Sequence, residues 1–95
     1  MTGTTLTSHG LDPRRKRLLF RCWHRGTREM DFLIGRFADA HLPAMSDAEL
    51  DEFERLIDLP DPDLYAALTG ARPLPAEVEG AMFERMRDFR PADGL

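Results

Sequence analysis

The 95-residue sequence predicts an all-α protein, a compact bundle of five short helices. Apolar residues recur at spacings of three and four in several segments, which is the period of an amphipathic helix. β-branched residues are few and nowhere alternate with polar ones, so no segment favours a strand. Proline, glycine and small polar residues separate five helical segments, and the short connections predict neighbours that are antiparallel or steeply crossed.

The first helix is expected to begin at Asp12-Pro13, a capping residue followed by the proline typical of a first turn, and to end near His24. Its core stripe follows the spacing i, i+3, i+4 and consists of Leu19, Cys22 and Trp23. Its remaining surface is cationic and carries Arg14, Arg15, Lys16, Arg17 and Arg21. Gly26 breaks the helix, and we expect a left-handed or otherwise unusual backbone conformation there.

The second helix is expected to start at Thr27 or Arg28 and to end near His41. Its core face has the spacing 0, 3, 4, 7, 8 and consists of Met30, Leu33, Ile34, Phe37 and Ala38. Phe32 lies off this stripe. The third helix opens with the capping box Ser46-Asp47-Ala48-Glu49. Its core residues are Leu50, Phe53, Leu56 and Ile57.

The fourth helix is expected to begin at Asp61-Pro62, again a cap followed by proline, and to end at Gly70. Its packed residues are Leu64, Tyr65 and Leu68. The fifth is expected to begin near Pro75 and to end at Arg90-Pro91. Its stripe consists of Val78, Met82, Met86 and Phe89.

Length and composition indicate one domain, residues 12–90, between flexible ends at 1–11 and 91–95. The first ten residues lack the apolar stretch of a secretory signal, and no apolar run is long enough to span a bilayer. Cys22 is the single cysteine and is interpreted as a buried core residue, which suits a reducing compartment. We therefore expect a cytoplasmic bacterial protein that does not insert into the membrane and is monomeric when free.

The sequence offers no pattern of catalytic or metal-binding residues. His9, His24 and His41 lack the spacing of a metal site, and no glycine-rich loop suits a phosphate or dinucleotide. No Ser/His/Asp grouping can be assembled either. We therefore predict no catalytic, metal-binding or cofactor-binding residues, no tightly bound cofactor and no enzymatic activity.

Charge is distributed unevenly along the chain. Residues 1–28 hold seven basic residues and one acidic residue, a net +6, whereas residues 29–95 hold six basic and 16 acidic residues, a net −10. The basic first helix raises nucleic-acid binding as an alternative function. The isoelectric point near 5.3 disfavours that alternative, because nucleic-acid-binding domains carry a broad basic face.

The segment from Arg25 to Asp31 places two guanidinium groups and two carboxylates around a glycine hinge. The simplest interpretation is a corner between two helices with a surface ion pair from Arg25 to Glu29. However, Arg25-Gly26-x-x-Glu29 resembles the RGxxE signature of the SdhE family, also called YgfY, and of its mitochondrial relatives. The basic helix before it and the block Asp61-Pro62-Asp63-Leu64-Tyr65 are similar to that family too, so the resemblance covers residues 13–89. One departure is Ala67, where the family often has Trp.

The resemblance implies an assembly factor that binds the flavoprotein subunit of succinate dehydrogenase, and in some bacteria that of fumarate reductase, and promotes its covalent flavinylation. Carried over to this chain, the signature makes Arg25, Gly26 and Glu29 partner-binding residues. Arg28 lies between signature positions, and Phe32 is a candidate apolar anchor one turn after Glu29. Two alternatives remain open: an antitoxin-like regulatory protein-interaction module and a small flavin-binding protein.

Overall fold

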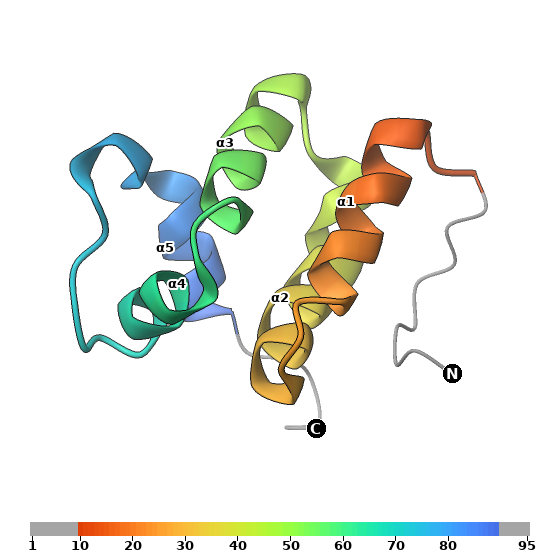
Figure 1. Ribbon diagram of the computed structural model, residues 1–95. Coiled ribbons are helices and arrows are strands. Elements are labelled where there is room, and N and C mark those ends of the chain that lie inside the picture. The colour runs from red at the N-terminus through yellow and green to blue at the C-terminus, as the bar shows by residue number, and fades with distance from the viewer. Residues whose placement is uncertain (1–9, 90–95) are drawn as a thin grey trace. The chain divides into compact units, whose positions relative to one another are not determined.

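The computed structural model describes residues 10–89, which form five α-helices and two short 3-10 helices and contain no strand (Figure 1). The predicted all-α class is therefore confirmed. The chain divides into two compact units, with the boundary between Met45 and Ser46. The predicted single domain at 12–90 stays a prediction, and the flexible ends predicted at 1–11 and 91–95 fall largely outside the described residues.

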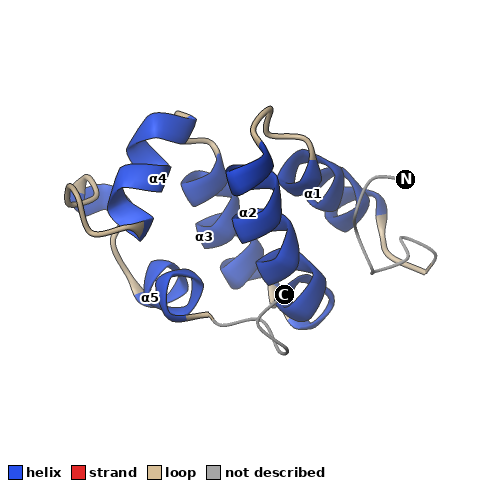
Figure 2. Ribbon diagram, turned by 90° about the horizontal axis from the view of Figure 1, so that it is seen from below, coloured by secondary structure: helices blue, strands red, loops and turns tan. Residues whose placement is uncertain are grey.

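The N-terminal unit is a helical hairpin. Helix α1 (Pro13–Trp23) packs against α2 (Arg28–His41), which runs back along it and continues into the 3-10 helix η1 (Leu42–Ala44) (Figures 1 and 2). The predicted core stripe of α1 is confirmed, because Leu19, Cys22 and Trp23 are all buried. Asp12 occupies the predicted N-cap position, but its carboxylate bonds to the Arg15 side chain (2.8 Å) instead of a backbone N–H.

The core face of α2 is rotated slightly from the predicted one. Four of its five predicted members are buried, but the prediction for Leu33 was wrong, since 44% of its surface is exposed. Gly35 is buried instead, because the Trp23 ring from α1 packs on its bare backbone. The glycine lets α1 approach that side of the helix and leaves Leu33 at the opposite edge.

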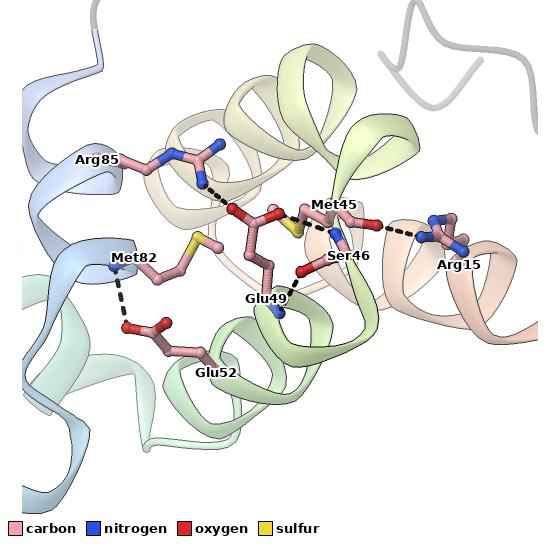
Figure 3. Close-up of polar contacts among 7 residues, drawn as sticks. All are labelled: Arg15, Met45, Ser46, Glu49, Glu52, Met82 and Arg85. Carbon is pink, nitrogen blue, oxygen red and sulfur yellow. Dashed lines mark hydrogen bonds and ion pairs between the residues drawn. The ribbon is translucent and has the colours of Figure 1, made fainter.

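Arg15 is part of this hairpin's internal structure, although the sequence assigned it to a cationic surface. Its Nε donates to the backbone oxygen of Leu42 at 3.2 Å, and its Nη2 donates to that of Met45 (Figure 3). Leu42 is the first residue of η1 and Met45 is its C-cap, and the Leu42 oxygen also accepts the Met45 N–H at 3.2 Å. The guanidinium therefore ties the start of α1 to the end of the unit.

The C-terminal unit contains α3 (Asp47–Ile57), α4 (Asp61–Leu68), the 3-10 helix η2 (Ala76–Val78) and α5 (Ala81–Asp88). The predicted capping box of α3 is confirmed, with Ser46 N–H donating to Glu49 Oε1 (2.8 Å) and Glu49 N–H to Ser46 Oγ (3.1 Å) (Figure 3). All four predicted core residues of α3 are buried. Helix α3 packs against η2 and α5.

Helix α4 follows its prediction with two corrections. Pro60 takes the N-cap position, so Asp61 already lies in the first turn, and Tyr65 is 42% exposed rather than packed. Leu64 is buried as expected, and Ala67 is buried too. Gly70 ends the helix with a φ of +83°, as predicted.

The fifth helix begins six residues later than predicted. Residues 76–78 form η2, and Val78 is only half-buried there, outside the stripe assigned to it. The start of α5 is set by a side chain from α3, because Glu52 Oε2 accepts the backbone N–H of Met82 at 3.1 Å (Figure 3). Met82 and Met86 are buried as predicted. The helix ends at Asp88, before the predicted end at Arg90-Pro91.

Candidate functional site

The corner between α1 and α2 is a short, tightly specified turn. Gly26 has a φ of +108°, which confirms the unusual conformation predicted there. A Cβ atom built on Gly26 would meet nothing within 4 Å, so the glycine is required by its backbone angle and not by crowding. Thr27 then caps α2 by accepting the Met30 N–H on its Oγ1 at 3.3 Å. The backbone of Gly26 is therefore accessible to a partner, and the turn that carries it has a fixed conformation.

Asp31 holds the two sides of this corner together. Its Oδ1 accepts the backbone N–H of Arg25 at 2.5 Å, so the residue before the glycine is tied to the first turn of α2. The sequence placed Asp31 next to the signature but gave it no role. Glu29 lies two residues before Asp31 and is exposed, whereas Arg25 is half-buried. The predicted ion pair between Arg25 and Glu29 stays a prediction.

An open depression of about 600 Å³ lies at this corner. It is lined by Trp23, His24, Gly26, Thr27, Arg28, Asp31 and Phe32. The structure thus brings together three of the five predicted partner-binding residues, namely Gly26, Arg28 and Phe32. Arg25 and Glu29 belong to the same corner but do not line the depression. Trp23 and His24 were missed as site residues, since the sequence assigned Trp23 to the core alone.

Phe32 forms an apolar part of the depression. It is 38% exposed, which confirms that it lies off the core stripe. The guanidinium of Arg36, one turn further along α2, lies 5.2 Å from the ring centroid, a cation–π contact that holds the ring on the surface. An aromatic ring and an arginine that line the same depression suit a partner surface that combines an apolar side chain with a carboxylate or carbonyl.

Trp23 makes the floor of the depression rigid. Its ring is buried against Gly35, and its Nε1 donates to Asp39 Oδ1 at 3.2 Å. Gly35 and Asp39 are one turn apart on α2, so both contacts come from one side of that helix. No pattern in the sequence pointed to either residue, because each matters only through the ring that α1 places against it.

The described residues offer little support for other chemistry. Residues 10–89 contain no cluster of His, Cys, Asp or Glu side chains that could hold a metal ion. Burial raises the pKa of the Cys22 thiol to about 12, so this cysteine is a core residue and not an activated nucleophile. Within the same part of the chain, none of the helices has the length and apolar character needed to cross a membrane.

Comparisons with known proteins connect this fold to a family. A sequence model of the Sdh5 family, described as flavinator of succinate dehydrogenase, matches residues 16–90. The FAD assembly factor SdhE of Acetobacter pasteurianus is 46% identical over 76 residues, which are 80% of this chain and 70% of that protein. The mitochondrial succinate dehydrogenase assembly factor 2 of Danio rerio is 36% identical over 81 residues, which are 83% of this chain and 51% of that protein.

The corresponding assembly factor 2 of Mycosarcoma maydis is 47% identical over 60 residues, 63% of this chain but only 25% of that protein. The chain therefore spans about half or less of these two mitochondrial relatives. No solved structure matches the chain. The residues matched by the family model include most of α1, all of α2 and every residue that lines the depression.

Proposed function

Because the chain belongs to the Sdh5 family, the flavinators of succinate dehydrogenase, we propose that it is an assembly factor that binds the flavoprotein subunit of that enzyme and promotes its covalent flavinylation. The observation that carries this proposal is the family match over residues 16–90. It is supported by the SdhE relative, which aligns with 80% of the chain.

We propose that the partner docks on the corner between α1 and α2, through Arg25, Gly26, Arg28, Glu29 and Phe32. Three features of the corner support this. Gly26 leaves backbone open to a close approach, Arg28 offers a forked donor, and Phe32 offers an apolar surface in the same depression. The turn is already held by the Asp31 and Thr27 hydrogen bonds, so docking costs little conformational entropy at this corner.

The role that suits such a surface is that of a chaperone and not of an enzyme. A protein that binds one conformer of the flavoprotein better than the others shifts its population toward that conformer. The reacting groups of flavinylation would then all come from the flavoprotein and FAD, and none from this chain. The depression is open, and among residues 10–89 Arg28 is the one arginine that lines it and could pair with the FAD phosphates. This supports the proposal that the free chain does not hold FAD tightly.

The family resemblance also implies the fumarate reductase flavoprotein as a client in some bacteria, so we extend the proposal to that protein. We further propose that the free chain is a cytoplasmic monomer. The client range is tested by mixing the chain with each purified flavoprotein, and the monomer by sedimentation of the free chain. FAD binding is tested by dialysis of the free chain against the flavin, for which we expect no retained colour.

The function is tested with the purified flavoprotein subunit, FAD and the full chain. Covalent flavin is measured as fluorescence that stays with the denatured subunit. We expect the chain to accelerate flavinylation and the Glu29→Ala variant to lose most of this effect, whereas Glu79→Ala, an exposed acid of the C-terminal unit, keeps it. A native chain that neither binds the subunit nor accelerates flavinylation would overturn the proposed function.

The docking corner has a matched glycine control. Gly26 and Gly70 both have positive φ, +108° and +83°, and a Cβ atom on either would meet nothing within 4 Å. Leucine at either position should therefore strain the backbone to a similar degree. We expect Gly26→Leu to lose affinity for the flavoprotein and Gly70→Leu to keep it. Equal affinities for the two variants would show that the corner is not the docking site.

A further inference from the structure

The solvent-facing side of α1 carries a row of side chains that the corner does not account for. Lys16, Arg17, Phe20 and His24 are exposed. Lys16 and Arg17 precede Phe20 by four and three positions, and His24 follows it by four, so the four residues lie on one side of the helix. The buried Leu19 and Cys22 lie on the other side. We call these four residues the outer stripe of α1.

Phe20 is the unusual member of this stripe. It is 63% exposed, more than any other large apolar side chain among residues 10–89. Its ring stacks on the imidazole of His24, with 3.9 Å between centroids and 14° between planes. The Nδ1 of His24 lies 2.8 Å from the Phe20 backbone oxygen, which fixes the imidazole beneath the ring. An ordered aromatic ring presented to solvent is the kind of anchor that interfaces use.

The stripe is continuous with the docking corner. His24 belongs to both, because it stacks on Phe20 and also lines the depression with Gly26 and Phe32. A partner seated in the depression therefore lies next to the Phe20 ring. One partner can cover both surfaces without a gap.

The charge of the stripe points to an acidic partner. Lys16 and Arg17 lie one turn before Phe20 on α1, and residues 1–28 carry a net +6 on a chain whose remainder carries −10. A cationic strip on an otherwise acidic protein attracts an acidic surface in one orientation and repels it in others.

We propose that the outer stripe of α1 is a second docking element for the flavoprotein subunit, and that it takes an acidic segment of that subunit carrying an apolar side chain for the Phe20 ring. This inference rests on the proposed function. A nucleic acid fits less well, because the chain has a net charge of −4 and the basic face is one helix wide. A membrane surface fits less well too, since an interfacial helix needs a broad apolar face and this stripe carries a single apolar ring.

The apolar anchor is tested by binding kinetics with the immobilised, purified flavoprotein subunit. We expect Phe20→Ser to dissociate about tenfold faster than the native chain, as for loss of an interface anchor. Tyr65→Ser is the matched control, because Tyr65 is also an exposed aromatic but lies on α4. Since Phe20 is largely exposed, its variant should keep the native melting temperature, which is measured in parallel. Equal dissociation rates for the two variants would overturn the inference.

The charge of the stripe is tested by association rates. We expect Arg17→Glu to associate several-fold more slowly at low salt and to approach the native rate at high salt, because screening removes the steering. Arg55→Glu makes the same charge change on an exposed residue of α3 and should have little effect. A salt-independent loss, or an equal loss in both variants, would contradict electrostatic docking at the stripe.

The outcomes separate this inference from the proposed function. If Phe20→Ser and Arg17→Glu bind like the native chain while Gly26→Leu does not, the corner docks and the stripe does not. If the native chain itself fails to bind the subunit, the proposed function is wrong. If the native chain instead binds vesicles of anionic lipid or a short single-stranded oligonucleotide, and Phe20→Ser abolishes that binding, the stripe serves another partner and the inference is overturned.

Discussion

The indole ring of Trp23 lies directly on the backbone of Gly35. A Cβ atom added to Gly35 would overlap the carbons at the fusion of the two indole rings. The same ring donates its N–H to Asp39, one turn further along α2. Trp23 therefore sets both the spacing of the two helices and their register, directly beneath the depression that it helps to line. The geometry of the candidate site depends on this contact.

The first prediction concerns Gly35→Ala. The added methyl group forces the rigid ring or the helix to move, which costs about 1–3 kcal/mol. Alanine returns about 1 kcal/mol through its higher helix propensity. We expect a net loss of up to about 2 kcal/mol in the free energy of unfolding, measured by urea denaturation. In a Trp23→Leu background only the gain in helix propensity remains, so Gly35→Ala should there stabilise the chain by up to about 1 kcal/mol. An equal loss in both backgrounds would show that the ring is not responsible.

The second prediction concerns Arg15. Its guanidinium reaches the backbone oxygens of Leu42 and Met45, and its side chain is only 20% exposed. Lysine cannot supply the same fork of donors, so Arg15→Lys loses at least one of these two hydrogen bonds. We expect a loss of about 1–2 kcal/mol in the free energy of unfolding. Arg17→Lys, at an exposed position on the same helix, should change it by less than about 0.5 kcal/mol. Equal effects would contradict the role of the fork.

Local signals in the sequence predicted most of the helices. The end of α1 shortly before Gly26, the start of α2 after Thr27 and the Ser46 capping box depend on residues within one turn, so their patterns are readable from the chain alone. The start of α5 does not depend on local residues. It is fixed by the Glu52 carboxylate, which comes from 30 positions earlier, and the apolar spacing around Val78 therefore suggested a helix that the chain does not form.

The same difference between local and distant contacts explains why only part of the candidate site was predicted. Gly26, Arg28 and Phe32 lie within one short segment, so spacing and the resemblance to a signature could identify them. The residues that hold the corner in place were missed. Asp31 acts through the backbone of Arg25, and Gly35 acts through a ring that another helix supplies. Such roles depend on which residues of different helices contact one another, and amphipathic spacing predicts only which face of a helix is buried.

The third prediction is a pH dependence at Glu49. The hydrogen bond from the Ser46 backbone N–H, aided by Arg85, lowers the pKa of this carboxyl below its ordinary value of 4.5 (Figure 3). The unfolded chain then binds the proton more tightly than the folded chain, so this contribution to stability is present above pH 4.5 and is lost as the pH falls through the folded pKa.

Glu49→Gln tests this dependence through melting temperatures measured from neutral pH into the acid range. We expect the variant to be less stable than the native chain at neutral pH, and the difference to narrow as the native carboxyl becomes protonated. Glu77→Gln, an exposed acid on η2, is the control for loss of one charge. A gap between native chain and Glu49→Gln that stays constant with pH would contradict the role of the charged carboxylate.

The last prediction separates the fold of the corner from its proposed function. Asp31→Ala removes the acceptor for the Arg25 N–H, so the turn around Gly26 loses the bond that joins its two sides. We expect the free energy of unfolding to fall by about 1 kcal/mol. We also expect faster hydrogen exchange at the Arg25 amide and weaker binding of the flavoprotein, because the corner must then be ordered during docking.

Two variants decide between this role and a direct contact of Asp31 with the partner. Asp31→Asn keeps an oxygen that can accept the Arg25 N–H but removes the charge, so it should restore slow exchange and most of the affinity. Asp63→Ala removes an acid from the first turn of α4 in the same way and controls for the effect of the helix dipole. If Asp31→Asn exchanges slowly yet binds as weakly as Asp31→Ala, the carboxylate contacts the partner directly and the positioning role is wrong.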